Sequence, residues 1–210
     1  MDEYLIKLNV MKLLQFIWTT AMVSILLAAC NNTNRRAADD SVDQAQDVND
    51  TSAMVNKQDA DFAVKAADAG LAEIELGKLA LEKATAQRIK DFAQQMVSDH
   101  QKANEELMAI ATRLNITLPP VVSEDHVDKQ RKLRDKSGEA FDEDYMDLMV
   151  KDHDRAVSLF EDAASDARNA DLQAFAAKTL PTLKKHFEEA KILRDSISPM
   201  DTTTIQRVIP

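Results

Sequence analysis

Four polar side chains stand where four amphipathic segments of this sequence would otherwise place apolar ones. Glu73, His100, His153 and His186 each interrupt an apolar repeat of three and four residues, and each lies near the middle of its segment. Groups equally far from both ends of packed helices lie at one level, whichever way the helices run. Imidazoles together with a carboxylate suit zinc, iron, copper or nickel. The pattern therefore predicts a site for one zinc or iron ion, held by these four residues.

A metal-free network of buried polar groups is the alternative that the same residues leave open. Burying an ionised Glu73 is costly unless it is paired, so a protonated imidazole would have to pair with it, and the others would hydrogen-bond to it or to water. Three acidic residues close to the histidines could orient an imidazole or face solvent: Asp99, Asp152 and Glu189. His126 lies in a charged stretch, and we expect it to be solvated.

The segments that must position these groups predict an all-α fold. The apolar repeat indicates long helices over 59–83, 86–114, 139–167 and 170–197. Short joins make the first two helices antiparallel neighbours, and likewise the last two. The long connection has a charged middle, 123–136, which could form a surface helix, and Pro181 should kink or split the last helix. We therefore predict a four-helix bundle over 59–197, made of two antiparallel hairpins and one long crossover, without a sequence repeat beyond the hairpin pattern.

The two ends of the chain are predicted to lie outside this bundle. Lys12 precedes an apolar run that ends in Leu27-Ala28-Ala29-Cys30, which resembles the lipobox of a bacterial lipoprotein signal. The alternative is an ordinary signal with a chance cysteine. We expect a signal peptide over 1–29, a flexible tether over 30–58 and a C-terminal tail over 198–210. A lipidated Cys30 would anchor the chain to a membrane of the cell envelope, the outer rather than the inner because Asn31 follows, with the bundle periplasmic or extracellular.

Composition excludes several classes of function. One cysteine rules out a disulfide framework and a cysteine-based zinc site, and a net charge of −10 disfavours nucleic-acid binding. The sequence contains no glycine-rich phosphate loop and no G-x-S-x-G motif. An enzyme is less favoured than a metal-binding module or a metal-free structural or protein-interaction bundle, because one level of polar groups is little for a catalytic pocket. The sequence names no protein partner.

Several short motifs, in order, give a resemblance to a known family. They are Asp61-Phe62, Gly70-Leu71-Ala72-Glu73, Asp99-His100, Asp152-His153, and Leu180-Pro181 before His186. Over about 59–195 the chain resembles the bacterial domain-of-unknown-function family 4142. The resemblance implies a ferritin-like bundle in a secreted or envelope protein, and no established activity. The Glu-x-x-His motifs of two-metal ferritin-like proteins are missing, because Val97 and Leu183 stand three residues before His100 and His186.

Overall fold

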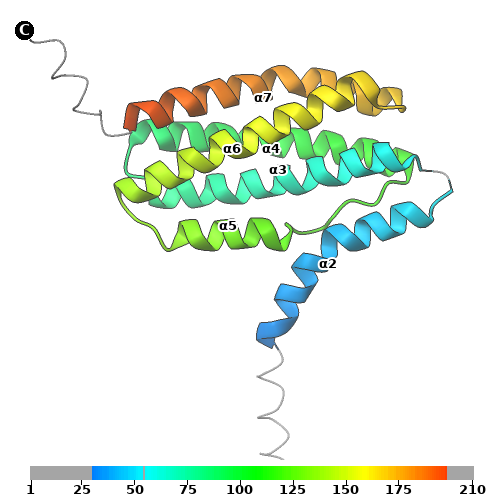
Figure 1. The fold of residues 1–210 in the computed structure, drawn as a ribbon, viewed down its shortest axis with the longest axis horizontal. Helices are drawn as coiled ribbons and strands as arrows, with labels where there is room; N and C mark the ends of the chain where they lie inside the picture. The colour runs from blue at the N-terminus through cyan, green and yellow to red at the C-terminus, as the bar shows by residue number, and fades with distance from the viewer. Residues whose placement is uncertain (1–29, 54, 198–210) are drawn as a thin grey trace, which may run out of the picture. The chain divides into compact units, whose positions relative to one another are not determined.

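The computed structural model describes residues 30–53 and 55–197, and every regular element within them is an α-helix (Figure 1). The predicted signal segment and C-terminal tail lie outside the described residues. The helices are α2 (Cys30–Thr51), α3 (Lys57–Lys83), α4 (Gln87–Leu114), α5 (Glu124–Arg134), α6 (Glu139–Asp166) and α7 (Ala170–Ile197). None of these described helices is both long and apolar enough to cross a bilayer. The prediction of an all-α chain is confirmed.

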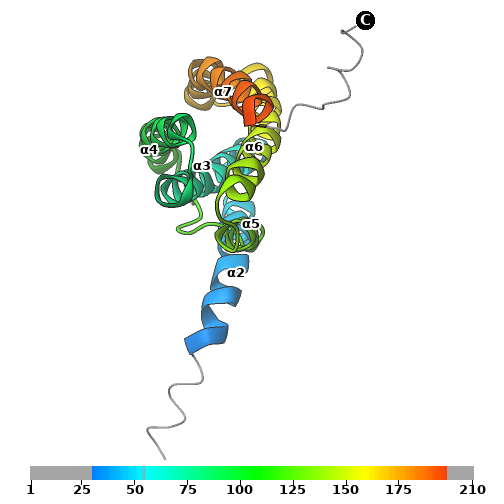
Figure 2. The same ribbon diagram turned by 90° about the vertical axis from the view of Figure 1, so that its left-hand side faces the viewer.

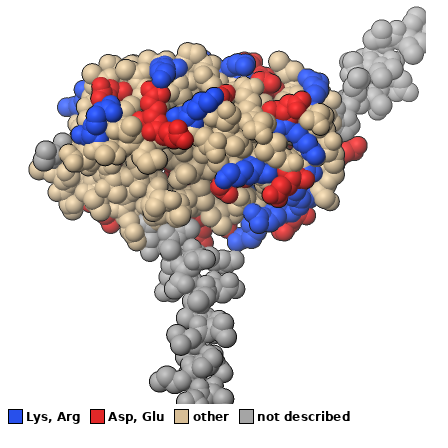
Figure 3. All heavy atoms as spheres, turned by 180° about the vertical axis from the view of Figure 1, so that it is seen from behind, with Lys and Arg blue, Asp and Glu red and all other residues tan. Residues whose placement is uncertain are grey.

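The four long helices α3, α4, α6 and α7 pack together within the compact unit Asp39–Pro210. Contacts pair α3 with α4 and α6 with α7, and the two pairs meet through α3 with α6 and α4 with α7 (Figures 1 and 2). The crossover helix α5 lies against α3 and α6. On the face drawn in Figure 3, basic side chains are interspersed with acidic ones. That face therefore offers no continuous basic surface to a polyanion.

The buried apolar side chains form two clusters along the long helices. One is built around Phe62, Leu107, Phe160 and Phe175. The other is built around Leu76, Phe92, Tyr145 and Met149. On each long helix, the polar residue that interrupts the apolar repeat falls between its contributions to the two clusters. The fold therefore sets one polar level between two apolar ones.

Local chemistry explains where the long helices begin and end. The side chain of Asn56 caps α3 by accepting a hydrogen bond from the backbone N–H of Asp59. Asn115 ends α4 in the left-handed conformation at φ 55°, and Gly138 precedes α6 at φ 63°. Pro181 does not split the last helix, since α7 is continuous from Ala170 to Ile197 with the proline inside it. Its missing N–H removes one hydrogen bond without ending the helix.

Part of the segment predicted to be a flexible tether is helical. Within α2, Ser41 donates a hydrogen bond to the carbonyl oxygen of Val121 at 3.0 Å. Asn49 donates to the carbonyl of Thr117 at 2.9 Å and accepts from the N–H of Thr117 at 2.8 Å. Ala45 is buried between them in the sequence, one helical turn from each. The buried face of this half of α2 thus consists of small and polar residues. Such a face gives no apolar repeat in the sequence, and the helix could not be predicted from one.

Two aspartates tie the helical hairpins to each other. Asp59, near the start of α3, accepts hydrogen bonds from the backbone N–H groups of Arg168 and Asn169, both at 2.9 Å. Asp142, near the start of α6, accepts hydrogen bonds from the N–H groups of Thr85 and Ala86, both at 3.0 Å. Each carboxylate therefore caps the turn of the other hairpin.

This reciprocal arrangement reveals an internal correspondence that the sequence alone does not make evident. Buried positions of the first hairpin recur at the same spacing in the second, where Asp59, Phe62, Ile89, Phe92 and Ala93 correspond to Asp142, Tyr145, Leu172, Phe175 and Ala176. The histidines do not follow it: His153 corresponds to Gly70, and His186 corresponds to Ala103. The polar centre therefore departs from the correspondence between the two hairpins.

Candidate metal centre

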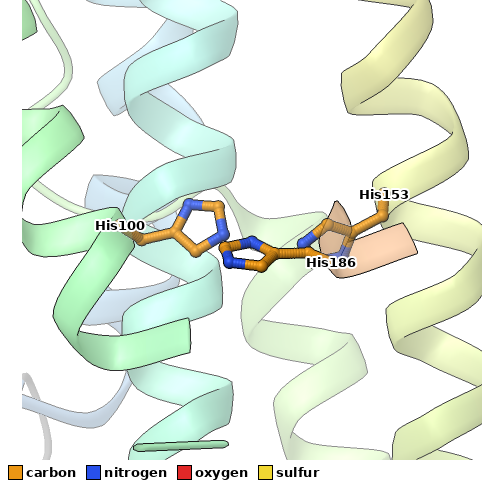
Figure 4. Close-up of side chains that lie close together, drawn as sticks. All are labelled: His100, His153 and His186. Carbon is orange, nitrogen blue, oxygen red and sulfur yellow. The ribbon is translucent and has the colours of Figure 1, made fainter. Parts of the chain in front are cut away.

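Three histidines from three helices face one another at the polar level (Figure 4). His100 comes from α4, His153 from α6 and His186 from α7, and all three are buried. Their ring centroids are 5.5 to 5.7 Å apart. One ring nitrogen from each lies within 4.8 Å of the other two. The arrangement gathers three nitrogen donors around a single point.

Each of the three rings keeps one buried nitrogen without a hydrogen-bond partner: Nε2 of His100, Nε2 of His153 and Nδ1 of His186. Two of the rings are oriented by a hydrogen bond from their other nitrogen. Nδ1 of His153 donates to the carbonyl oxygen of Met149 at 3.0 Å, and Nε2 of His186 donates to Oδ2 of Asp99 at 3.1 Å. A carbonyl oxygen only accepts, so Nδ1 of His153 carries the hydrogen and Nε2 keeps its lone pair. Such outward hydrogen bonds are typical of metal-binding histidines.

The surroundings of the three rings favour the neutral form of each. Burial and the neighbouring rings of His153 and His186 hold the pKa of His100 well below its usual value. Burial, together with His186, lowers the pKa of His153 to about 4. Burial also lowers the pKa of His186, although Asp99 opposes this shift. Neutral imidazole is the form that binds metal ions, so at neutral pH no proton has to leave.

Glu73, predicted as a fourth ligand, does not join this group. Its Oε1 lies 3.8 Å from Nδ1 of His153, the nitrogen that already donates to Met149. Its other oxygen is buried without a partner. Burial above all, and then the negative charge of Asp152, raise the pKa of Glu73 well above its usual value. The carboxyl group therefore lies beside Nδ1 of His153, and its burial favours the neutral form.

The acidic residues predicted to orient the histidines have different positions. Asp99 does orient a ring, but that ring is His186 on another helix, not its neighbour in the sequence. Asp152 is instead directed to Lys129, at 3.5 Å, and to Arg155, at 3.3 Å. The negative charge of Glu189 acts on His186 by raising its pKa.

His126 is not solvated as predicted. Its side chain is only 15% exposed, and its Nε2 lies 3.5 Å from Oδ2 of Asp68 on α3. Asp68 also accepts hydrogen bonds from the N–H and the hydroxyl group of Ser123, at 2.7 and 2.8 Å. These contacts hold the start of α5 against α3. The role of Asp68 could not be predicted from the sequence, because its partners belong to the crossover, whose path the helical repeat does not define.

The metal-free chain should lose stability as the pH falls from about 6.5 towards 4. Unfolded histidines take up protons near pH 6.5, whereas folded His153 does so only near pH 4. In that window each such histidine removes up to about 1.4 kcal/mol of folding free energy per pH unit. Glu73 acts in the opposite direction, because its raised pKa lets the folded state hold a proton that the unfolded state has lost. The loss of stability caused by three histidines should exceed the gain caused by one carboxyl group.

Urea unfolding in the presence of a chelator, followed by circular dichroism at several pH values, measures this dependence. The Glu73→Gln variant should show the steeper loss in acid, since it lacks the opposing group. A free energy of unfolding that stays constant from pH 6.5 to 5 would contradict the burial of three neutral imidazoles.

Comparisons with known proteins identify a family and a fold. The model of a family described as "Domain of unknown function (DUF4142)" matches residues 44–193. Among solved structures, the chain is similar to a crystal structure of a DUF305 fragment from Deinococcus radiodurans. The TM-score is 0.58 at 14% identity, over 66% of this chain and 96% of that one. At this identity the likeness concerns the fold alone. No curated protein matches.

Proposed function

The chain belongs to the DUF4142 family of unknown function, and we propose that it binds one transition-metal ion through His100, His153 and His186. The observation that carries the proposal is the convergence of three buried histidines, each of which also keeps one buried ring nitrogen without a partner. A buried polar group without a partner costs about 1–3 kcal/mol. One bound ion would satisfy all three nitrogens at once, because each neutral imidazole can present a lone pair to it.

The donor set defines the class of ion. Three neutral imidazoles without a thiolate suit borderline divalent ions, and we propose zinc or iron. Nitrogens bound to zinc at about 2.1 Å in a tetrahedral site lie about 3.4 Å apart. The three nitrogens here lie within 4.8 Å of one another, so binding requires the rings to draw together. The three nitrogens would therefore form a preformed cluster of donors that contracts when the ion binds.

We also propose that the four long helices form a ferritin-like four-helix bundle that holds a single ion. The pairing of α3 with α4, α6 with α7, α3 with α6 and α4 with α7 supports this interpretation. The two-metal sites of such bundles use carboxylates and histidines together. Here the histidine cluster contains no carboxylate, and Glu73 lies beside Nδ1 of His153. The donors therefore favour one ion over two.

We propose that this bundle belongs to a lipoprotein of the cell envelope. The support is the sequence Leu27-Ala28-Ala29-Cys30 after an apolar run. If Cys30 carries the lipid anchor, Cys30→Ala should move the protein from the membrane fraction to the soluble fraction of the cells that produce it. The Asn31→Ala variant keeps the cysteine and should stay bound. Retention of Cys30→Ala in the membrane would refute the anchor.

Metal analysis of the purified chain tests the binding proposal against the metal-free alternative. The chain, purified without chelator and dialysed against zinc or iron(II), should retain one ion per molecule. Its melting temperature should rise with the concentration of free ion. A metal-free polar network predicts no stoichiometric ion and an unchanged melting temperature.

A further inference from the structure

A second set of buried polar atoms lies between the crossover helix and the histidine centre. The side chains that carry them line a cavity of about 40 Å³, to which α5 contributes His126, α3 contributes Glu73 and α6 contributes Asp152. The same cavity is lined by His100 and His153 of the proposed metal centre. Its volume is enough for a few water molecules or one ion, because a single water needs about 10–15 Å³. One continuous space thus connects the underside of α5 with two of the three histidines.

Each of these three side chains keeps one atom without a partner. They are Oε2 of Glu73, Oδ2 of Asp152 and Nδ1 of His126, all buried. The remaining polar atoms of His126 and Asp152 are held in place. Nε2 of His126 lies 3.5 Å from Asp68, and Oδ1 of Asp152 lies 3.5 Å from Lys129. Two oxygens and a nitrogen of residues that line the cavity therefore remain without a partner. These atom types bind the same borderline ions as the histidine centre.

The histidine centre is sealed, so an ion needs a way in. The relative exposures of His100, His153 and His186 are 8%, 1% and 1%. An ion passing along the helix axes would cross one of the two apolar clusters and lose its hydration without compensation. The path beneath α5 offers polar atoms instead.

Helix α5, which covers this cavity, is held by few buried apolar contacts. Leu133 is its only buried residue. Its other attachments are polar, including the bonds from Ser123 to Asp68 and the contact of Lys129 with Asp152. An element with few buried apolar contacts opens at low free energy. Opening of α5 would expose the three free atoms to solvent.

From these observations we infer that Glu73, Asp152 and His126 form a transfer station for divalent transition-metal ions. The station takes up an ion beneath α5 and passes it through the shared cavity to the histidines. This inference rests on the proposed function. It gives Glu73 and His126 a role in the delivery of the ion rather than in its final coordination.

Loading kinetics with cobalt(II) test the transfer station, because cobalt bound to imidazoles absorbs visible light. In the full chain, Asp152→Asn and His126→Gln should each slow loading by about tenfold or more, since a charged and polar path raises entry rates by 10–10³. Release to a chelator should slow by a similar factor, and the final spectrum should stay that of the unchanged protein. The matched control is Asp128→Asn on α5, whose carboxylate pairs with Arg131 at the surface. It should load within twofold of the unchanged chain.

The outcomes separate the two proposals. No cobalt spectrum in the unchanged chain would overturn the metal centre and the station together. Normal loading in Asp152→Asn and in His126→Gln would overturn the station alone. A slower loading matched by an equal loss of affinity, with release unchanged, would also overturn it, because the residues would then act on the bound ion and not on its path. If Asp152→Asn does not fold by circular dichroism, His126→Gln decides.

Discussion

In the His153→Ala variant, zinc should no longer raise the melting temperature. The variant removes one of three converging nitrogens, and the other two cannot hold an ion inside an apolar core. In the unchanged chain, free zinc at a hundred times its dissociation constant should add about 2.7 kcal/mol, or about 5–10 °C at this chain length. The unchanged chain should therefore show the full zinc-dependent rise in melting temperature, and the His153→Ala variant should show none of it. Differential scanning calorimetry with and without zinc measures it.

A control for the loss of packing is the Met149→Ala variant. Met149 is fully buried one turn before His153, and its side chain belongs to the apolar cluster. The substitution should lower the basal free energy of unfolding by about 2–5 kcal/mol. It should keep the zinc-dependent shift, because the backbone carbonyl that orients His153 remains. An equal zinc shift in both variants would show that His153 is not a ligand.

A large loss of stability is also expected from Asp142→Ala. Asp142 is 3% exposed and accepts hydrogen bonds from the backbone N–H groups of Thr85 and Ala86 and from the hydroxyl of Thr85. No side chain caps α4 at Ala86, and this carboxylate instead binds the two backbone N–H groups just before the helix. Hydrogen bonds to a charged group contribute about 1.5–3 kcal/mol each. We expect a loss of about 3 kcal/mol or more in the free energy of unfolding, measured with urea.

Asp144→Ala is the matched control for this substitution. Asp144 lies two residues further along the same helix, and its carboxylate forms a surface ion pair with Lys136 at 2.9 Å. Exposed pairs contribute at most about 1 kcal/mol. Equal losses in the two variants would mean that Asp142 does not fasten the second hairpin to the first.

The long helices and the level of the histidines could be predicted because both depend on spacing within one helix. A polar residue in an apolar repeat must face the core, and its height follows from its place along the helix. Spacing alone therefore indicates that His100, His153 and His186 lie together. The apolar repeat indicates equally well that Glu73 is buried, as it is at 5% exposure.

The direction in which Glu73 points could not be predicted. A helical repeat gives the face that a residue occupies but not its rotamer, and the carboxyl group lies beside Nδ1 of His153. The burial of His126 depends on Asp68, more than fifty residues away, and so on the path of the crossover. The N-terminal helix escaped notice because Ser41 and Asn49 hold it through hydrogen bonds to a loop. The orientation of Glu73, the burial of His126 and the position of the N-terminal helix all depend on tertiary contacts between distant parts of the chain.

X-ray absorption at the metal edge of the chain loaded with one equivalent of zinc tests the central claim most directly. The account predicts a shell of ligands at about 2.0–2.1 Å, in which three nitrogens show the outer-shell scattering of imidazole rings. Replacement of His153 by alanine should remove that signature. A shell of oxygen ligands without imidazole scattering would contradict the account, because the ion would then be bound at surface carboxylates and not at His100, His153 and His186.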